Sequence, residues 1–233
     1  MFFNGNHSQA CEYMKDHKLI LRMLEKSRFN RRLHNLSMLI NDLFHQLGMI
    51  VKSLSENTEY LLDSFPVPIC DNIRIFNAKL IHSEQFRGYI ASKKRYFYGV
   101  RVQLLTTKTG IPVEFVFLPG SANDVRALNA LPLNLPPQSH IYADAAYSDY
   151  GVETVLKQSE KIELKVMRKK NPSARTHPAQ QYIKQQTRYY IETVFSSITR
   201  VFPKSIHAVT YDGFLLKLEA FLMAFTLQQA FLE

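Results

Sequence analysis

Residues 94–120, KRYFYGVRVQLLTTKTGIPVEFVFLPG, contain two runs rich in β-branched and aromatic side chains, separated by the turn signal KTG. Two such runs joined by a short turn that contains glycine are typical of an antiparallel hairpin. The stretch therefore predicts the centre of a β-sheet, and strands on either side of the hairpin would complete that sheet.

The neighbouring segments supply those strands and the helices between them. On the N-terminal side, YLLDSFPVPI at 60–69 predicts a strand that ends at its two prolines. On the C-terminal side we predict strands at HIYAD (140–144) and IELKVM (162–167). Helices are predicted at 124–131, at 147–157, and in two long segments at 179–202 and 214–231. The fold class is thus α/β, a mixed sheet flanked by helices.

The N-terminal quarter carries no strong strand signal. Apolar residues recur there at three- and four-residue intervals in LHNLSMLINDLFHQLGMIV, and Ser27 is a plausible N-cap for the segment that holds Arg28 and Arg31. We predict a helical region over residues 1–57 and a second domain over residues 58–233.

Charge and cysteine content restrict the partners and the location. The chain has a formal net charge of +9, concentrated in basic clusters, which indicates a polyanion such as DNA, although solvated surfaces remain an alternative. Its two cysteines stand far apart with no zinc-ligand spacing, which favours a reducing cytoplasm. Lys217 and Glu219 interrupt the apolar C-terminal stretch, so we expect a buried or partner-facing helix and no membrane partner.

Three carboxylates stand out by position: Asp63 in the first strand, Asp144 at the end of HIYAD, and Glu192 inside a long helix. If they converge, their oxygens suit Mg²⁺ or Mn²⁺, and two such ions can cut a phosphodiester. Each acid also has a plainer interpretation. Asp63 could begin a turn, Asp144 could cap a helix, and Glu192 could pair with Arg188 one helical turn earlier.

Five blocks of this sequence, in order, resemble the DDE transposases of insertion sequences of the 982 type. The blocks are DSFPVPICDNIRI (63–75), FRGYIASKKRYFYGVRVQLL (86–105), TGIPVEFVFLPGSANDVRAL (109–128), IYADAAY (141–147) and IETVFSSITRVFPKSIHAVT (191–210). The resemblance implies an RNase H-like catalytic domain that cuts DNA at transposon ends and joins the freed 3′-hydroxyl to target DNA. It also implies that Asp63, Asp144 and Glu192 are the catalytic residues and the ligands of two Mg²⁺ or Mn²⁺ ions.

The expected partners follow from the same resemblance. They are double-stranded DNA, as terminal inverted repeats and as target, and further copies of the chain in a homodimer or higher oligomer; the location is the bacterial cytoplasm, at the nucleoid. Asp124 matches a recurrent family Asp, but a helix cap is the favoured role. The candidate DNA-binding residues are Arg28, Arg31, Arg32, Lys93, Lys94, Arg95, Arg168, Lys169, Lys170 and Arg188.

Two departures from the family pattern support an alternative. Ala145 stands where relatives carry Lys after the second Asp, and MFFNGNHSQACEYM resembles a point well inside the N-terminal region of relatives. The alternative is a truncated, catalytically inactive transposase that only binds DNA. A structure-selective nuclease on the same fold is a further possibility.

Overall fold

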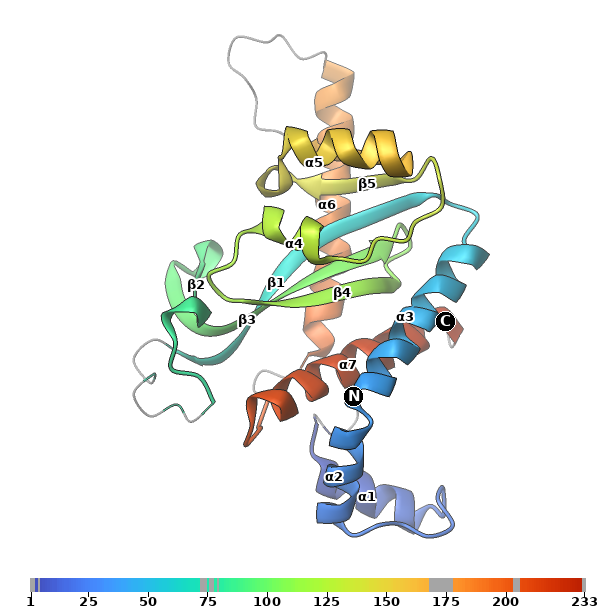
Figure 1. Cartoon of the computed structure of the whole chain (residues 1–233), viewed down its shortest axis with the longest axis vertical. Helices are drawn as coiled ribbons and strands as arrows, with labels where there is room; N and C mark the ends of the chain where they lie inside the picture. The colour runs from blue at the N-terminus through green and yellow to red at the C-terminus, as the bar shows by residue number, and fades with distance from the viewer. Residues whose placement is uncertain are drawn as a thin grey trace.

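Three helices lead into a central sheet that carries further helices on both faces (Figure 1). The computed structural model describes residues 3, 5–71, 75, 78, 80–167, 178–202 and 206–231. The first helices are α1 (His7–Asp16), α2 (Lys26–Asn35) and α3 (Ser37–Leu54), so the helical expectation for this region is met. The expected cap at Ser27 is wrong, because α2 begins one residue earlier and Glu25 occupies the N-cap position without a side-chain hydrogen bond.

The sheet is mixed, as predicted. Its strand order is β2-β3-β1-β5-β6, and β4 pairs with β3. The antiparallel partners of β3 are β1, β2 and β4, whereas β5 runs parallel to both β1 and β6. The bounds are β1 Glu59–Asp71, β2 Arg87–Ile90, β3 Arg95–Thr107, β4 Pro112–Pro119, β5 His140–Asp144 and β6 Glu163–Met167.

Strand β1 does not end at its prolines, contrary to the prediction. It runs on through Pro66 and Pro68 to Asp71, paired with β3 along one edge, and the register shifts between Pro68 and Cys70. On its other edge β1 pairs with β5 only as far as Leu62. Proline lacks an N–H and is tolerated where a strand edge makes no ladder hydrogen bonds. The prolines are therefore compatible with a strand that has lost one neighbour.

The predicted helices are all present. They are α4 (Asp124–Ala130), α5 (Tyr150–Val155), α6 (Pro178–Val201) and α7 (Tyr211–Phe231). The carboxylate of Asp149 accepts hydrogen bonds from the N–H groups of Gly151 and Val152, which fixes the start of α5. A π-helical turn, Leu156–Glu160, continues α5 toward β6. The stretch RKKNPSARTHP (168–178) predicts a loop, and of its residues 168–177 lie outside the described residues while Pro178 begins α6.

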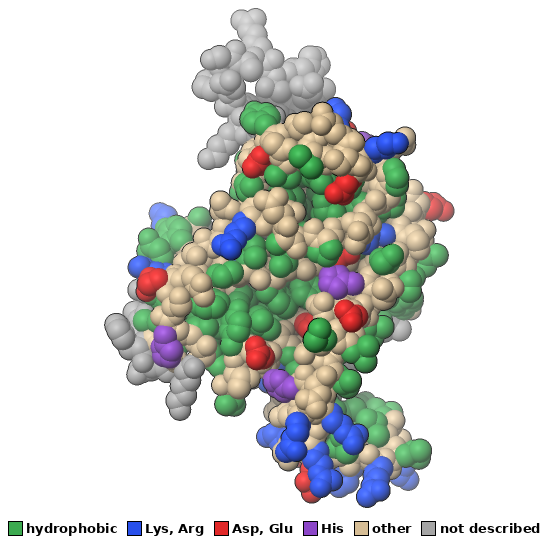
Figure 2. Space-filling model, in the orientation of Figure 1, with side chains coloured by type: hydrophobic (Ala, Val, Ile, Leu, Met, Phe, Trp, Pro, Cys, Tyr) green, Lys and Arg blue, Asp and Glu red, His purple; other side chains and the backbone are tan. Residues whose placement is uncertain are grey.

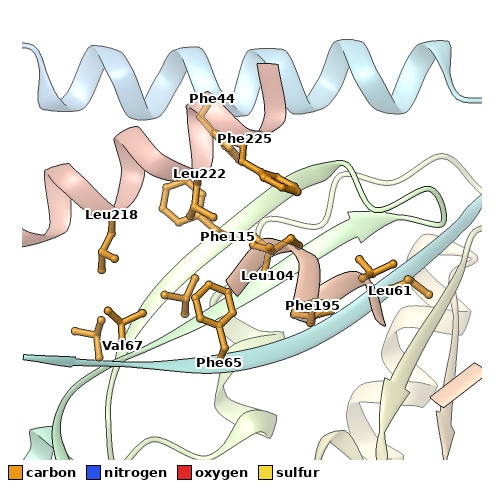
Figure 3. Close-up of a cluster of buried hydrophobic side chains, with 14 of the residues drawn as sticks. Phe44, Leu61, Phe65, Val67, Leu104, Phe115, Phe195, Leu218, Leu222 and Phe225 are labelled. Carbon is orange, nitrogen blue, oxygen red and sulfur yellow. The ribbon is translucent and has the colours of Figure 1, made fainter. Parts of the chain in front are cut away.

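Helix α7 is a core helix. By length and composition it could cross a membrane, with a mean hydropathy of 1.2 over a window that is 44% buried. Figure 3 shows its Leu218, Leu222 and Phe225 directed at the sheet, close to Phe44 of α3 and Phe115 of β4. The burial of these side chains within the molecule accounts for the apolar sequence, as the prediction of a buried helix required.

Helix α3 is held to the sheet by a buried ion pair. The Nζ atom of Lys52 lies 2.6 Å from Glu114 Oε1 on β4, and both side chains are almost fully buried. Lys52 also donates to the carbonyl of Leu133, and His45 Nδ1 lies 2.6 Å from the second Glu114 oxygen. Breaking such a pair leaves an uncompensated buried charge, so α3 and β4 are strongly coupled.

Candidate functional site

Asp63 and Asp144 lie side by side at the place where two parallel strands separate. The pairing between β1 and β5 ends at Leu62 and Ala143, and Asp63 and Asp144 are the next residues of the two strands. Paired strands lie about 4.8 Å apart, and the charge of Asp144 acts on Asp63 where this pair of strands opens. The carboxyl ends of parallel strands are also where α/β sheets commonly bind their ligands.

Both carboxylates are directed to the same face of the sheet. Leu61 and Phe65 of β1 belong to the core that includes α6 and α7, and side chains alternate along a strand, so Asp63 between them faces that side. On β5, Tyr142 packs against the same core, which gives Asp144 the same orientation by the same rule. Helix α6 covers this face and contacts β1.

The electrostatics of Asp63 show that its charge is poorly compensated. Burial is the largest cause that raises the pKa of Asp63, from its ordinary 3.8 to about 6, and repulsion by Asp124 and Asp144 adds to it. Two effects oppose this rise: the N–H of Ser64 donates to Asp63 Oδ1 at 2.7 Å, and Arg101 lies nearby. A half-buried acid beside other acids is a place where a cation would be stabilised.

Glu192 lies on α6 and is paired with Arg188. The Nε atom of Arg188 donates to Glu192 Oε1 at 3.0 Å, and the two side chains are 65% and 61% exposed. The pKa of Arg188 is raised first by this hydrogen bond and then by the charge of Asp144, with a smaller effect from Asp63. Arg188 therefore lies within electrostatic reach of all three candidate carboxylates.

The three acids do not form a closed metal cage. Within the described residues, no group of three or more His, Cys, Asp and Glu side chains is close enough to hold a metal ion. Asp63 and Asp144 are adjacent, whereas the Glu192 carboxylate is directed to Arg188, which is the pairing that the plainer interpretation anticipated. Likewise Asp144 accepts a hydrogen bond from the N–H of Ala145, in the manner of a cap.

The family is decided by a match that covers most of the chain. The family model described as Transposase DDE domain matches residues 55–227. The chain belongs to this family. The match spans both aspartates and Glu192.

One solved structure with a similar arrangement is the piggyBac transposase synaptic complex with hairpin DNA, at 11% sequence identity and a TM-score of 0.49. The likeness covers 74% of this chain and 46% of that chain, so this chain spans less than half the length of its structural neighbour. No curated protein matches the chain.

Sequence reasoning missed a polar network around Asp124 of the transposase domain. The helix cap expected from Asp124 is made by Asn123, whose Oδ1 accepts from the N–H of Arg126. The carboxylate of Asp124 instead accepts from Ser64 Oγ and from Gln103 Nε2, each at 2.9 Å. Arg101 Nη1 lies 3.5 Å from the same oxygen, Asp124 Oδ1.

Gln103 is the centre of that network. It is fully buried in β3, and its carbonyl oxygen accepts a hydrogen bond from the buried hydroxyl of Tyr147. The signal for Gln103 was a polar residue between Val102 and Leu104 in the run VQLL, since a buried amide requires partners. The network ties β1, β3, α4 and the turn after β5 together, directly behind the two aspartates.

The candidate DNA-binding residues occupy several exposed surfaces of the transposase. Arg28, Arg31 and Arg32 are exposed on α2, in the region where Figure 2 shows Lys and Arg gathered at the lower end of the molecule. Lys93, Lys94 and Arg95 form the exposed tip between β2 and β3. Arg168, Lys169 and Lys170 lie outside the described residues.

Aromatic rings accompany the basic tip. Tyr89 and Tyr96 pair across β2 and β3 with ring centroids 5.0 Å apart, and both are about half exposed. The guanidinium of Arg87 lies 4.4 Å from the centre of the Tyr96 ring. In contrast, Phe97 and Tyr98 are buried, so the aromatics of KKRYFYGVR divide between a surface role and a core role.

Proposed function

We propose that this protein is a transposase of an insertion sequence of the 982 type, which cleaves DNA at transposon ends and transfers the freed strand to target DNA. The observation that carries the proposal is the adjacent pair Asp63 and Asp144 at the divergence of two parallel strands. The raised pKa of Asp63 and the family match over residues 55–227 support it.

The donor set fits Mg²⁺ or Mn²⁺. These hard cations prefer carboxylate oxygens, and a divalent charge would offset the repulsion that Asp63 receives from Asp144 and Asp124. In the proposal two metal ions are held by the carboxylates of Asp63, Asp144 and Glu192. When bound, such ions activate water or a 3′-hydroxyl as the nucleophile and stabilise the departing oxygen.

Glu192 would join the aspartates by leaving Arg188. An exposed pair four residues apart on a helix contributes only about 0.3–0.5 kcal/mol, so rotation of Glu192 costs little. The charges of Asp144 and Asp63 already act on Arg188. Once released, Arg188 would therefore be close enough to contact a DNA phosphate that is bound at the aspartates. In this proposal Arg188 is a positioning and phosphate-binding residue.

DNA binding is proposed for the exposed basic surfaces. The arginines of α2 lie within about a third of the helix circumference, at positions 28, 31 and 32, so they can face one stretch of backbone. At the β2–β3 tip, Lys93 and Lys94 would contact phosphate while the half-exposed Tyr89 and Tyr96 present ring faces to the DNA. The cellular location in this proposal is the cytoplasm, at the nucleoid.

We further propose that two copies of the chain associate through α3. Seven large apolar side chains of α3 and its N-cap are 45–81% exposed, a surface on the order of 800 Å², which matches the area that each partner buries in a standard interface. Five of them recur at intervals of three, four and seven residues, the spacing of a helix-pairing seam. Those five are Leu36, Leu39, Leu43, Ile50 and Leu54.

The catalytic proposal is tested with a labelled DNA duplex that ends in the element's terminal repeat. Wild-type protein with Mg²⁺ should nick the labelled end, and Asp63→Asn, Asp144→Asn or Glu192→Gln should abolish the nick while DNA binding persists. Glu160→Gln, which removes one charge from an exposed turn, serves as the matched control and should cleave normally. Cleavage that survives all three substitutions would overturn the proposal.

A DNA-binding protein without chemistry is the second candidate. The pairing of Glu192 with Arg188, together with Ala145 beside Asp144, favours it. In that case the duplex would bind with a strong salt dependence, and neither Mg²⁺ nor Mn²⁺ would produce a nick.

A further inference from the structure

A basic cavity lies where α1 and α2 meet α7, away from the aspartates. Its volume is about 420 Å³, and a neighbouring cavity of about 280 Å³ shares four of its lining residues. Five basic side chains line the two cavities, with Asn30 among their polar neighbours: His7, Lys26, His34, His207 and Lys217. None of the described residues that line them is an Asp or a Glu.

The sequence brings these side chains together by helical spacing. Lys26, Asn30 and His34 recur every four residues on α2, so they stand on one face, opposite the face that carries Arg28 and Arg31. On α7, Gly213 and Lys217 are also one turn apart. A Cβ at Gly213 would lie 3.2 Å from a ring carbon of His34, so glycine leaves room for this close approach.

The cavity holds positive charge that the protein does not neutralise. The half-buried Lys217 donates to the carbonyl of His207 at 2.6 Å, and no carboxylate pairs with it in the described part of the chain. Burial lowers the pKa of Lys217, and repulsion by Lys26 lowers it further. Burial is likewise the main cause of the lowered pKa of His7, to which Lys217, His34 and Lys26 each add repulsion.

Such a cluster is arranged for an anion rather than for a metal cation. Partly buried cations are normally paired with an anion, whereas Lys217 has ammonium and imidazole neighbours instead. Metal binding does not explain the histidines, because within the described residues no three His, Cys, Asp or Glu side chains are close enough to hold an ion. His7 Nδ1 lies 2.5 Å from Asn30 Oδ1, so this pair is already oriented at the cavity wall.

We propose that this cavity binds a phosphate group. The donors are the ammonium groups of Lys26 and Lys217 together with the ring N–H groups of His34 and His207, since even a neutral imidazole keeps one N–H. A phosphate would supply the missing negative charge and would connect α2 to α7, the N-terminal helices to the core. Its source is either a backbone phosphate of DNA or a free phosphate compound.

The first arm of the test uses inorganic phosphate and the full chain. Isothermal titration calorimetry at constant ionic strength in chloride should show binding by the wild type, and at least a tenfold loss of affinity in Lys217→Met and in His34→Gln. Lys157→Met, an exposed lysine on another element, is the matched control and should bind phosphate as the wild type does. Circular dichroism checks that each variant is folded.

The second arm identifies the source by titrating a short DNA duplex against salt. If the cavity takes a backbone phosphate, Lys217→Met lowers DNA affinity and reduces the slope of log K against log salt by about one. If it takes a free phosphate, DNA affinity stays at the wild-type value while phosphate binding is lost. Should neither ligand distinguish Lys217→Met and His34→Gln from Lys157→Met, the inference is wrong. Neither arm requires DNA cleavage, so failure of the phosphate-binding inference can be distinguished from failure of the catalytic proposal.

Discussion

Replacing Asp63 by Asn should stabilise the protein at neutral pH. The folded state raises the pKa of Asp63 to about 6, against an ordinary value of 3.8. A raised carboxyl pKa means that the folded state binds the proton more tightly than the unfolded state does. This group therefore favours folding below about pH 4, and that contribution is lost as the pH rises through about 6.

The size of the effect follows from the shift. Each pKa unit corresponds to about 1.4 kcal/mol, so the ionised Asp63 costs at most about 3 kcal/mol of unfolding free energy above pH 7. Asparagine keeps the shape but never ionises, and its amide needs a partner of its own, so we expect a net gain of about 1–3 kcal/mol. For a chain of this size that corresponds to a rise in Tm of roughly 3–10 °C.

Urea denaturation followed by far-ultraviolet circular dichroism, at pH 4.5 and at pH 7.5, measures this difference. Asp63→Asn should exceed the wild type at pH 7.5 and approach it at pH 4.5, while Glu160→Gln should match the wild type at both. Mg²⁺ should stabilise the wild type at pH 7.5 and leave Asp63→Asn unchanged. An Asp63→Asn variant no more stable at pH 7.5 than the wild type would refute the electrostatic reasoning.

Three further substitutions test the scaffold and the assembly. Lys52→Met removes the ammonium partner of buried Glu114 and should cost about 3–5 kcal/mol in urea denaturation; a loss below 1 kcal/mol would contradict the coupling of α3 to β4. Gly48→Ala would place a Cβ 2.1 Å from the carbonyl oxygen of Val113 and should destabilise by about 1–3 kcal/mol, measured as a lower Tm. Leu43→Glu should convert a dimer to a monomer in sedimentation experiments while circular dichroism shows the variant folded, and an unchanged sedimentation coefficient would count against the α3 seam.

The elements with strong local signals could be predicted from the sequence. The hairpin at 94–120 and the helix at 214–231 have clear periodicity and turn chemistry, and the structure has β3, β4 and α7 there. The short edge strand Arg87–Ile90 was not expected, because four residues with a glycine carry little strand signal, and its pairing with β3 supplies the stability. Pairing with β3 likewise extends β1 past its prolines, which the local sequence did not predict.

The two aspartates of the site could be predicted because local strand signals precede them, whereas the rest of the site could not. Asp63 and Asp144 follow strand signals, and the parallel register of β1 and β5 brings them together. The side-chain direction of Glu192 depends on Arg188 and on solvent, which no local pattern fixes. Asp124 was misassigned because its position before a helix resembles a cap, whereas long-range partners on β1 and β3 determine where its carboxylate points.

The divergence of β1 from β5 has a consequence for solubility. A strand edge without a neighbour is a template on which another molecule can add a strand, and such edges promote aggregation. Past Leu62, β1 presents such an edge for the rest of its length within the described residues. Pro66 and Pro68 lack the N–H that an incoming strand would need, so this opening is protected against intermolecular β-pairing.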